Sequence, residues 1–478
     1  MELFINSVVH ICLLLGIGYY FITAMQWYSY RLERVVFHYN RYDWHLYFFL
    51  FPLIGYYLLE GIFLHLLAIV FIALLAFWYQ KNDKKLVWTA RIKRFFLFLI
   101  LATLFQDLLC FVYDACQKFG IIIPLAIAQL LSMVFEKILF ESYKKEASQT
   151  LMHRPELKVI AITASYGKTS IKNFLAQILS KKFSVYKTPR SVNTLGGIIK
   201  DINTDLPKNC EVYIVEAGAR ARGDIDEIAK LVNPHIAIVG RVGEQHIEYF
   251  KTLENIRNTK MEIIHSSRLQ KAFVHESAHV QPRLEIVSFG SDVTRVVATL
   301  EGLEFDMIID GAEEHFTCNL LGDFNAINLA ASIHVARELG MSLDEIKQAI
   351  HNLKGVEHRL QKIEAGGKLI IDDSFNGNLE GMLSSYQLAS SHKGRKVIVT
   401  PGIVESTEEA NTILAQTIDK IFDVVIITGK SNASILDLHV RKAQKILLAD
   451  KSLLQKVLAE QTHVGDLILF SNDAPGFI

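Results

Sequence analysis

Residues 157 to 181 contain a short apolar run, a tight loop and then apolar residues at helical spacing, and the loop ends in Gly167-Lys168-Thr169-Ser170. A turn of this kind at the start of a helix can hold nucleotide phosphates on its backbone N–H groups, with the lysine as a compact positive charge and the threonine hydroxyl on Mg²⁺. The segment therefore predicts an ATP-binding phosphate loop, in which Ser165 also faces the nucleotide. Ile162 stands where the full eight-residue pattern has its first glycine, so an ordinary strand-to-helix turn is the alternative interpretation.

Two further buried-strand patterns lead to polar residues. The run 211–217 (EVYIVEA) contains Glu216 near its end, and the run 235–240 (HIAIVG) is followed a few residues later by His246. In open α/β sheets ligands bind beyond the carboxyl ends of the strands, so we expect Glu216 and His246 to point toward the phosphates on Lys168. A carboxylate and an imidazole beside a triphosphate suit Mg²⁺ that is held partly by phosphate oxygens. Each residue alone is more often a solvated polar group, and the hypothesis rests on their combination with the loop.

Lys260 shares one face of the helix expected over 253–265 with Leu253, Ile256 and Ile264. We therefore expect it to be partly buried, which disfavours the ammonium form and lowers its pKa. A neutral amine could react, or capture CO₂ as a carbamate that binds a metal. A lysine whose stem covers apolar surface while its charge reaches water explains the same pattern equally well.

Later segments add amides, an arginine and an acid. Asn325 and Asn328 lie near the start of a helix expected over 329–339, where asparagine is by default a cap. Arg359 stands near the start of a new α/β segment, and Asp373 follows the apolar strand pattern at 368–371. Two more strand patterns, at 397–402 and 424–429, predict a Rossmann-like domain that lacks Gly-x-Gly-x-x-Gly and need not bind a dinucleotide.

The strands and helices that would position these residues come after a sharp change in composition near residue 140. The chain has 478 residues and a formal net charge of zero, so no global charge argues for nucleic acid. Its five cysteines form no C-x-x-C pair, which gives no sign of a zinc site or a disulfide framework. The first 140 residues, however, carry long uncharged stretches at about 4–25, 44–59, 62–80, 95–113 and 120–140. Each is near the ~20 residues that a bilayer core requires.

Basic residues give the orientation of these stretches. They follow the first stretch, lie between the third and fourth, and follow the fifth, which places the N-terminus outside and everything after residue 140 in the cytoplasm, where ATP is available. The predicted fold class is therefore α/β behind N-terminal transmembrane helices. We expect about five spans in residues 1–145, a central P-loop α/β ATPase domain at 150–355 and a C-terminal Rossmann-like α/β domain at 356–478.

Taken in order, these motifs resemble the Mur ligase family. The stretch from Glu216 to Ile263 (EAGARARGDIDEIAKLVNPHIAIVGRVGEQHIEYFKTLENIRNTKMEI) and the run 371–382 (IDDSFNGNLEGM) are similar to the branch that joins D-alanyl-D-alanine to a UDP-N-acetylmuramoyl tripeptide. The resemblance covers about residues 155–430 and leaves the first 140 residues unexplained. It implies an ATP-dependent amide ligase of peptidoglycan precursor synthesis, which forms an acyl phosphate on the peptide and then an amide with the dipeptide.

The resemblance also implies roles for single residues. Lys168 and Thr169 would hold phosphates and Mg²⁺, Glu216 and His246 would bind the metal with Thr169, and Lys260 would be a carbamylated lysine at the same metal. The remaining residues would surround the nucleotide: Asn325, Asn328 and Asp373 beside it, and Arg359 on its phosphates once the domains close. Lys168, His246, Lys260 and Arg359 would thus be the catalytic group.

The chain departs from the family pattern in several places. Ala164 replaces a usual loop glycine, Phe324 replaces a common histidine, and the ending SNDAPGFI lacks the usual Lys-Gly-Ser. The N-terminal domain that grips the UDP-sugar in the family is not recognisable, and membrane spans stand in its place. We therefore expect a multi-pass protein of the inner (cytoplasmic) membrane with cytoplasmic catalytic domains.

The expected partners are the UDP-muramoyl peptide, D-alanyl-D-alanine, membrane lipid and cell-wall synthesis proteins, without nucleic acid. Two alternatives stay open. One is a Mur-type ligase with another acceptor, such as a polyglutamate or a lipid-linked muropeptide. The other is a non-catalytic, membrane-bound nucleotide-binding scaffold.

Overall fold

The computed structural model describes residues 2–28, 30–37, 42–82, 84–113, 118, 120–244, 247–281, 283–375, 377–403, 406–429 and 432–473. The chain divides into two compact units, Met1–Ser142 and Tyr143–Ile478. Helix α7 begins in the first unit and ends in the second, where Ala147 and Leu151 are buried. The division of the chain at residues 145–150 and 355 that the sequence suggested stays a prediction.

The first unit is helical. Its elements are α1 (Glu2–Trp27), α2 (Leu32–Phe37), α3 (Tyr42–His45), the π-helical η1 (Leu46–Leu50), α4 (Phe51–Leu58), α5 (Gly61–Lys81), α6 (Ala90–Tyr113) and α7 (Ile122–Met152). Aromatic rings of four of these elements meet in its interior, where Tyr20, Trp27, Trp44, Phe48 and Trp78 form ring contacts with centroids 5.4 to 6.4 Å apart.

Within the described residues, four helices are long and apolar enough to cross a membrane: Ser7–Trp27, Gly61–Lys81, Ala90–Tyr113 and Ile122–Met152. The second of the five expected stretches differs, because α3, η1 and α4 together cover only residues 42–58. Seventeen helical residues span roughly 26 Å at 1.5 Å each, somewhat short of a ~30 Å hydrocarbon core. Pro52 in α4 has no N–H to give to the preceding turn, and the π-helical segment lies directly before it.

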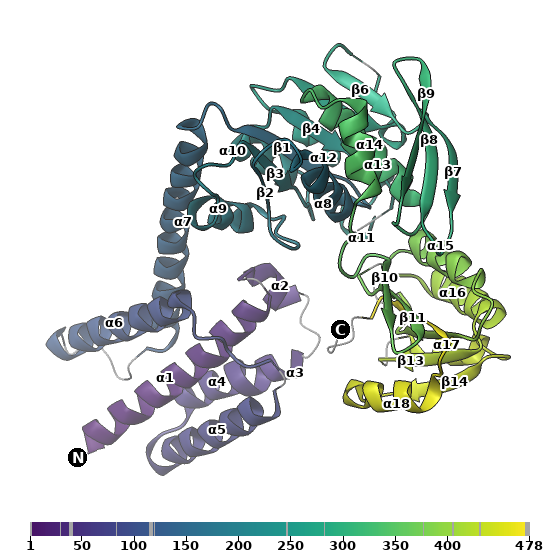
Figure 1. Ribbon diagram of the computed structural model, residues 1–478. Helices are drawn as coiled ribbons and strands as arrows, with labels where there is room; N and C mark the ends of the chain where they lie inside the picture. The colour runs from purple at the N-terminus through teal and green to yellow at the C-terminus, as the bar shows by residue number, and fades with distance from the viewer. Residues whose placement is uncertain are drawn as a thin grey trace. The chain divides into compact units, whose positions relative to one another are not determined.

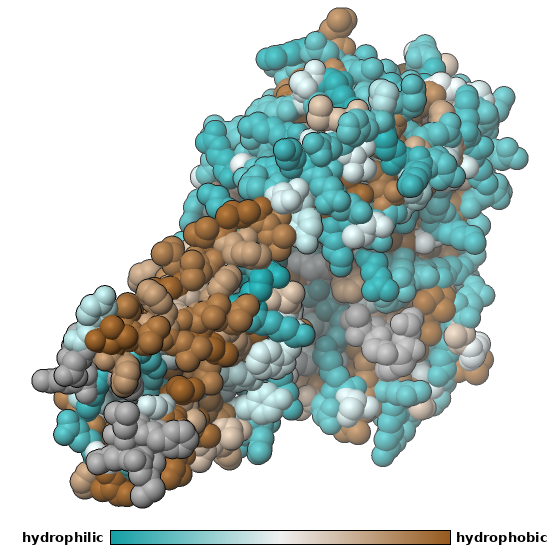
Figure 2. Space-filling model, turned by 90° about the vertical axis from the view of Figure 1, so that its left-hand side faces the viewer, coloured by the Kyte–Doolittle hydropathy of each residue, from teal (hydrophilic) through white to brown (hydrophobic). Residues whose placement is uncertain are grey.

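The first unit exposes much of its apolar surface. Ile69, Phe111 and Leu130, on three different helices, are 66%, 77% and 62% exposed. Figure 2 shows such side chains gathered over one part of the molecule, whereas polar side chains cover most of the rest. An apolar surface of this extent is rare on a protein that is surrounded by water, and it fits a hydrocarbon environment.

The second unit contains two six-stranded sheets and one small sheet. The first sheet has the order β2-β3-β1-β4-β5-β6, and every neighbouring pair is parallel. Its strands are β1 (Lys158–Thr163), β2 (Val185–Lys187), β3 (Val212–Glu216), β4 (Ile236–Val239), β5 (Lys271–His275) and β6 (Ile286–Phe289). The central strands are continuous apolar runs because helices cover both faces of the sheet.

Helices α8 (Lys168–Leu179) and α13 (Phe324–Glu338) pack side by side on one face (Figure 1), with the antiparallel sheet β7 (Val293–Ala298), β8 (Leu303–Ile309) and β9 (Ala312–Cys318) beside them. The other face contacts helices α9 and α10. The remaining elements here are α9 (Leu195–Thr204), α10 (Asp224–Val232), α11 (Ile247–Phe250), α12 (Leu253–Met261), η2 (Glu262–Ile264), η3 (Glu276–Ala278) and α14 (Leu343–His351).

The second large sheet has the order β10-β11-β15-β12-β13-β14, with only the β10–β11 pair antiparallel. Its elements are β10 (Gln361–Ala365), β11 (Lys368–Asp373), α15 (Leu379–Ser390), β12 (Lys396–Thr400), α16 (Glu408–Ile421), β13 (Val424–Thr428), α17 (Ala433–His439), β14 (Gln444–Leu448), η4 (Lys451–Leu453), α18 (Leu454–Gln461) and β15 (Leu467–Ser471). The α/β fold class and the Rossmann-like character of this part are confirmed.

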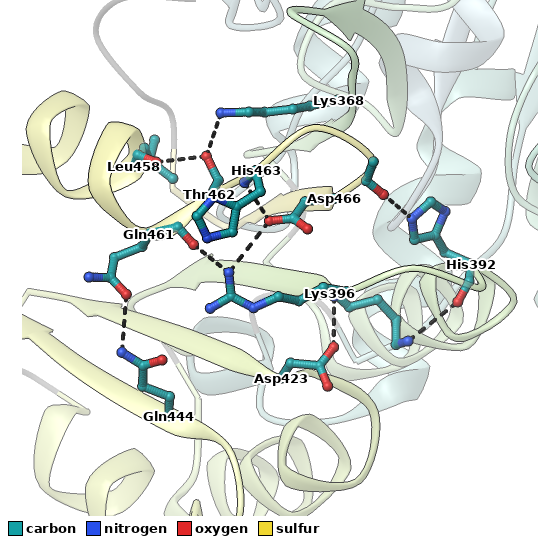
Figure 3. A network of polar contacts seen from close by, with 12 residues as sticks. Lys368, His392, Lys396, Asp423, Gln444, Leu458, Gln461, Thr462, His463 and Asp466 are labelled. Carbon is teal, nitrogen blue, oxygen red and sulfur yellow. Dashed lines mark hydrogen bonds and ion pairs between the residues drawn. The ribbon is translucent and has the colours of Figure 1, made fainter.

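A polar network ties the amino ends of these strands together (Figure 3). Lys368 Nζ donates to Thr462 Oγ1 at 2.7 Å, and the Lys396 backbone N–H donates to Asp423 Oδ2 at 2.8 Å. Asp466 Oδ2 accepts from the His463 backbone N–H at 2.8 Å. Because ligands of such sheets bind at the opposite, carboxyl edge, we interpret this network as structural.

Candidate active site

The phosphate loop lies between β1 and α8, as expected. Gly167, the residue before the helix, has φ +82°. A side chain there would be strained by the left-handed backbone, and its Cβ would overlap Asn328 Oδ1. The loop is anchored to the segment after β4, since the Ser165 N–H donates to the Arg241 carbonyl at 2.9 Å and Ser165 Oγ donates to the Gly243 carbonyl at 2.9 Å.

Lys168 folds back onto this loop. Its Nζ donates to the Ala164 carbonyl at 2.7 Å and to the Ser165 carbonyl at 3.1 Å. Burial lowers the pKa of Lys168 to about 8; the negative charge of Glu216 opposes this shift and the positive charge of Arg359 adds to it.

Glu216 lies at the end of β3, where register pairs it with Ile162 of β1. It is 1% exposed. Its Oε2 accepts from Thr169 Oγ1 at 3.1 Å and its Oε1 accepts from Asn193 Nδ2 at 3.1 Å. The structure therefore brings together the threonine and the glutamate that the sequence proposed as metal ligands.

Lys172 is a site residue that the sequence analysis missed. It lies one turn after Lys168 on α8, is fully buried, and its Nζ is 2.9 Å from Glu216 Oε2. The signal was available, because Lys172 falls among the buried residues of an amphipathic helix, the same pattern that singled out Lys260.

Lys260 is 3% exposed, as its place on an apolar helical face predicts. Burial lowers the pKa of Lys260 well below its ordinary value, and the charge of Lys168 lowers it further, against Asp224 and Glu262. No described residue forms a hydrogen bond or an ion pair with Lys260 Nζ. An isolated buried amine of this kind fits a reactive or modified lysine. His246, the other expected metal ligand, lies outside the described residues.

The two asparagines of α13 face the phosphate loop. Asn325 is 4% and Asn328 7% exposed, and Asn328 Nδ2 donates to Asn325 Oδ1 at 2.9 Å. Asn328 Oδ1 lies against Gly167, and Asn325 Nδ2 donates to the Leu321 carbonyl at 2.8 Å. Burial beside the loop distinguishes them from exposed helix caps. Ser170, in the first turn of α8, is also buried.

Arg359 lies between two residues with left-handed backbone, His358 (φ +61°) and Leu360 (φ +52°). Such conformations persist in residues with a Cβ only where the surroundings hold them. The acids at the end of β11 do so: His358 Nδ1 is 2.7 Å from Asp372 Oδ2, and the Leu360 N–H donates to Asp373 Oδ1 at 3.2 Å. Asp373 therefore supports the Arg359 loop, and its expected place beside the nucleotide stays a prediction.

The guanidinium of Arg359 lies close enough to the phosphate loop for its charge to act on Lys168. It donates to the Phe375 carbonyl. Burial lowers the pKa of Arg359, whereas the charges of Asp373 and Glu216 raise it. The positive charge of Arg359 also lowers the pKa of Lys168, so the two cations lie close enough to repel each other. The ring of Phe375, 55% exposed, lies beside this group and its neighbour Asn376 lies outside the described residues.

These residues fit a magnesium nucleotide. Thr169 and Glu216 supply oxygen atoms, which Mg²⁺ prefers, and Lys168 and Arg359 supply the positive charge that phosphates need. Fold and site together define a nucleotide-dependent α/β enzyme in which a phosphate loop on one sheet meets an arginine from a second.

Comparison with known proteins identifies the class. Residues 162–336 match the Mur ligase middle domain. It is similar to the UDP-N-acetylmuramoyl-tripeptide–D-alanyl-D-alanine ligase of Bacillus subtilis (strain 168), with 28% identity over 338 residues, 66% of this chain and 72% of the relative. The ligase of the same name from Escherichia coli (strain K12) is 27% identical over 66% of this chain and 75% of its own length.

Solved structures agree. The MurF ligase of Thermotoga maritima in complex with ADP matches with a TM-score of 0.61 and 26% identity, over 70% of this chain and 80% of that chain. The corresponding ligase of Acinetobacter baumannii matches with a TM-score of 0.62 and 26% identity, over 69% of this chain and 76% of that chain.

Proposed function

We propose that this protein is an ATP-dependent ligase that joins D-alanyl-D-alanine to a UDP-N-acetylmuramoyl tripeptide. The observation that carries the ligase assignment is the cluster of Thr169, Glu216, Lys260 and Arg359 around the phosphate loop. The dipeptide and the nucleotide-linked peptide are taken from the names of relatives that share about two thirds of the chain.

The reaction has two steps. A carboxylate oxygen of the tripeptide attacks the γ-phosphorus of ATP, the bond to the β-phosphate oxygen breaks, and an acyl phosphate and ADP form. The amine of D-alanyl-D-alanine then attacks the acyl carbon, phosphate leaves, and the amine gives up a proton. Lys168 and Arg359 would neutralise charge on the transferred phosphoryl group, and positioning rather than covalent chemistry by the protein provides the rate.

Mg²⁺ would supply further neutralisation of the phosphates when bound. Thr169, Glu216 and His246 would hold it, and Lys260 would join them as a carbamate. The buried Lys260 amine supports this role, because CO₂ adds only to a neutral amine and burial favours that form. Addition of CO₂ would replace the amine by an anionic carbamate, for which the metal would be the cationic partner.

The test of this function is mass spectrometry of products from the full-length protein with ATP, Mg²⁺, UDP-muramoyl tripeptide and D-alanyl-D-alanine. We expect a product that contains both substrates minus one water, formed together with ADP and phosphate. Product with a lipid-linked muropeptide or a glutamate acceptor alone would replace the substrate assignment. Absence of any ATP-dependent amide would favour a nucleotide-binding scaffold.

We also propose that the first unit is embedded in the cytoplasmic membrane as a multi-pass anchor. The four long apolar helices and their exposed apolar side chains support this placement. Such an anchor would hold the ligase near lipid-linked steps of wall assembly and the proteins that perform them. Extraction of membranes with alkaline carbonate tests it: an integral protein stays in the pellet, whereas release of the full-length chain into the supernatant would exclude membrane spans.

A further inference from the structure

Lys172 is the most deeply buried cation of the site. Its side chain is fully inaccessible, and its ammonium donates to the Arg190 carbonyl at 2.5 Å and pairs with Glu216 Oε2 at 2.9 Å. A lysine is almost never placed in such surroundings without a fixed negative partner. Lys172 lies on α8, one turn beyond Lys168. The helix that follows the phosphate loop therefore also provides the positive charge that pairs with Glu216.

One carboxylate oxygen of Glu216, Oε2, correspondingly has two donors in the nucleotide-free protein. Oε2 accepts from both Thr169 Oγ1 and Lys172 Nζ, and Oε1 accepts from Asn193 Nδ2. A carboxylate oxygen offers about two lone pairs, so a cation that approaches Oε2 must displace one of these donors. It would also come within a few ångströms of a buried ammonium, where like charges repel strongly because little water screens them.

We propose that Lys172 is a positioning residue that prevents Glu216 from binding a divalent cation until a nucleotide is present. The inference rests on the proposed function, because it takes Glu216 as the magnesium ligand. The negative charges of the triphosphate would offset the positive charge of the Lys172 ammonium. Phosphate oxygens would also supply ligands to the cation in addition to Glu216. Cation and nucleotide would then bind together, and by reciprocity each would raise the affinity of the other by the same factor.

The experiment measures binding of Mn²⁺, a spectroscopic substitute for Mg²⁺, to the full-length protein without nucleotide by electron paramagnetic resonance. We expect Lys172→Met to bind one Mn²⁺ at least tenfold more tightly than the unaltered protein, and the double variant Lys172→Met with Glu216→Gln to lose this gain. Lys187→Met is the matched control, since Lys187 lies close enough to Lys172 for their charges to interact but is not among the hydrogen-bond and ion-pair partners of the Glu216 carboxylate, and we expect no change.

A folded Lys172→Met protein whose Mn²⁺ affinity stays within twofold of the unaltered protein would overturn the proposal and leave Lys172 a structural residue. If Lys172→Met does not fold, Glu216→Gln alone decides the question. We expect it to bind Mn²⁺ like the unaltered protein in the absence of nucleotide, and loss of a saturable site would refute the inference. Ligation is assayed separately on the same preparation, so a failed substrate assignment would leave the cation result intact.

Discussion

Nucleotide binding should take up a proton at alkaline pH, because the pKa of Lys168 lies near 8 in the nucleotide-free protein. Phosphates placed on the lysine favour its charged form and raise that pKa again. Below pH 8 the ammonium is already present and binding needs no proton; above pH 8 the neutral amine must first be protonated. With a single site of this pKa, the apparent affinity for ATP should fall by about tenfold, or ~1.4 kcal/mol, between pH 7 and pH 9.

Isothermal titration calorimetry of ADP or ATP in two buffers of different ionisation enthalpy measures this directly. We expect uptake of about 0.1 proton per nucleotide at pH 7, about 0.5 at pH 8 and about 0.9 at pH 9. Lys168→Arg is the control, since a guanidinium stays charged throughout and its binding should not depend on pH in this range. The same proton uptake in Lys168→Arg would show that another group titrates and that the argument from the burial of Lys168 is wrong.

Three further predictions follow from single contacts. Gly167→Ala should weaken ATP binding by about 1–2 kcal/mol, because left-handed backbone disfavours a Cβ that would also overlap Asn328, and an undiminished nucleotide-induced thermal shift would contradict it. Arg241→Glu should lower kcat/KM no more than about fivefold, because its 2.7 Å pair with Glu380 is exposed to solvent, and Glu380→Arg in the same chain should restore the loss. If residues 42–58 cross the membrane as a fifth span, an N-terminal tag should be protected from protease in inside-out vesicles; with four spans it would be digested.

Much of the fold could be predicted from local patterns. Continuous apolar runs such as 159–162 give central parallel strands, and the change to helical spacing after Gly167 places α8. The carboxyl edge of the sheet then follows from topology, which is why Glu216 was expected near Lys168. The weaker prediction was the second membrane stretch, which is the shortest of the five and carries Pro52. The π-helical turn before this proline is a feature that only the folded chain shows.

The same limit applies to the site. Burial of Lys260 followed from its position on an apolar helical face. That no described residue forms a hydrogen bond or an ion pair with its amine is a property of packing that no spacing encodes. The sequence around Arg359 gives no local sign of the left-handed backbone that the acids of β11 hold on either side of it. Those hydrogen bonds join residues 13 and 14 positions apart, which meet only when the strand and the loop are folded together.

Local sequence is therefore sufficient to predict the phosphate loop, the α/β class and the apolar character of the first 140 residues, because each depends on residues that are neighbours in the chain. The tertiary structure alone decided that Lys172 pairs with Glu216 and that Arg359 shares the electrostatic environment of Lys168. Coulomb interactions and desolvation depend on distance and burial in space, and residues 44 or 191 positions apart acquire both only when sheets and helices pack.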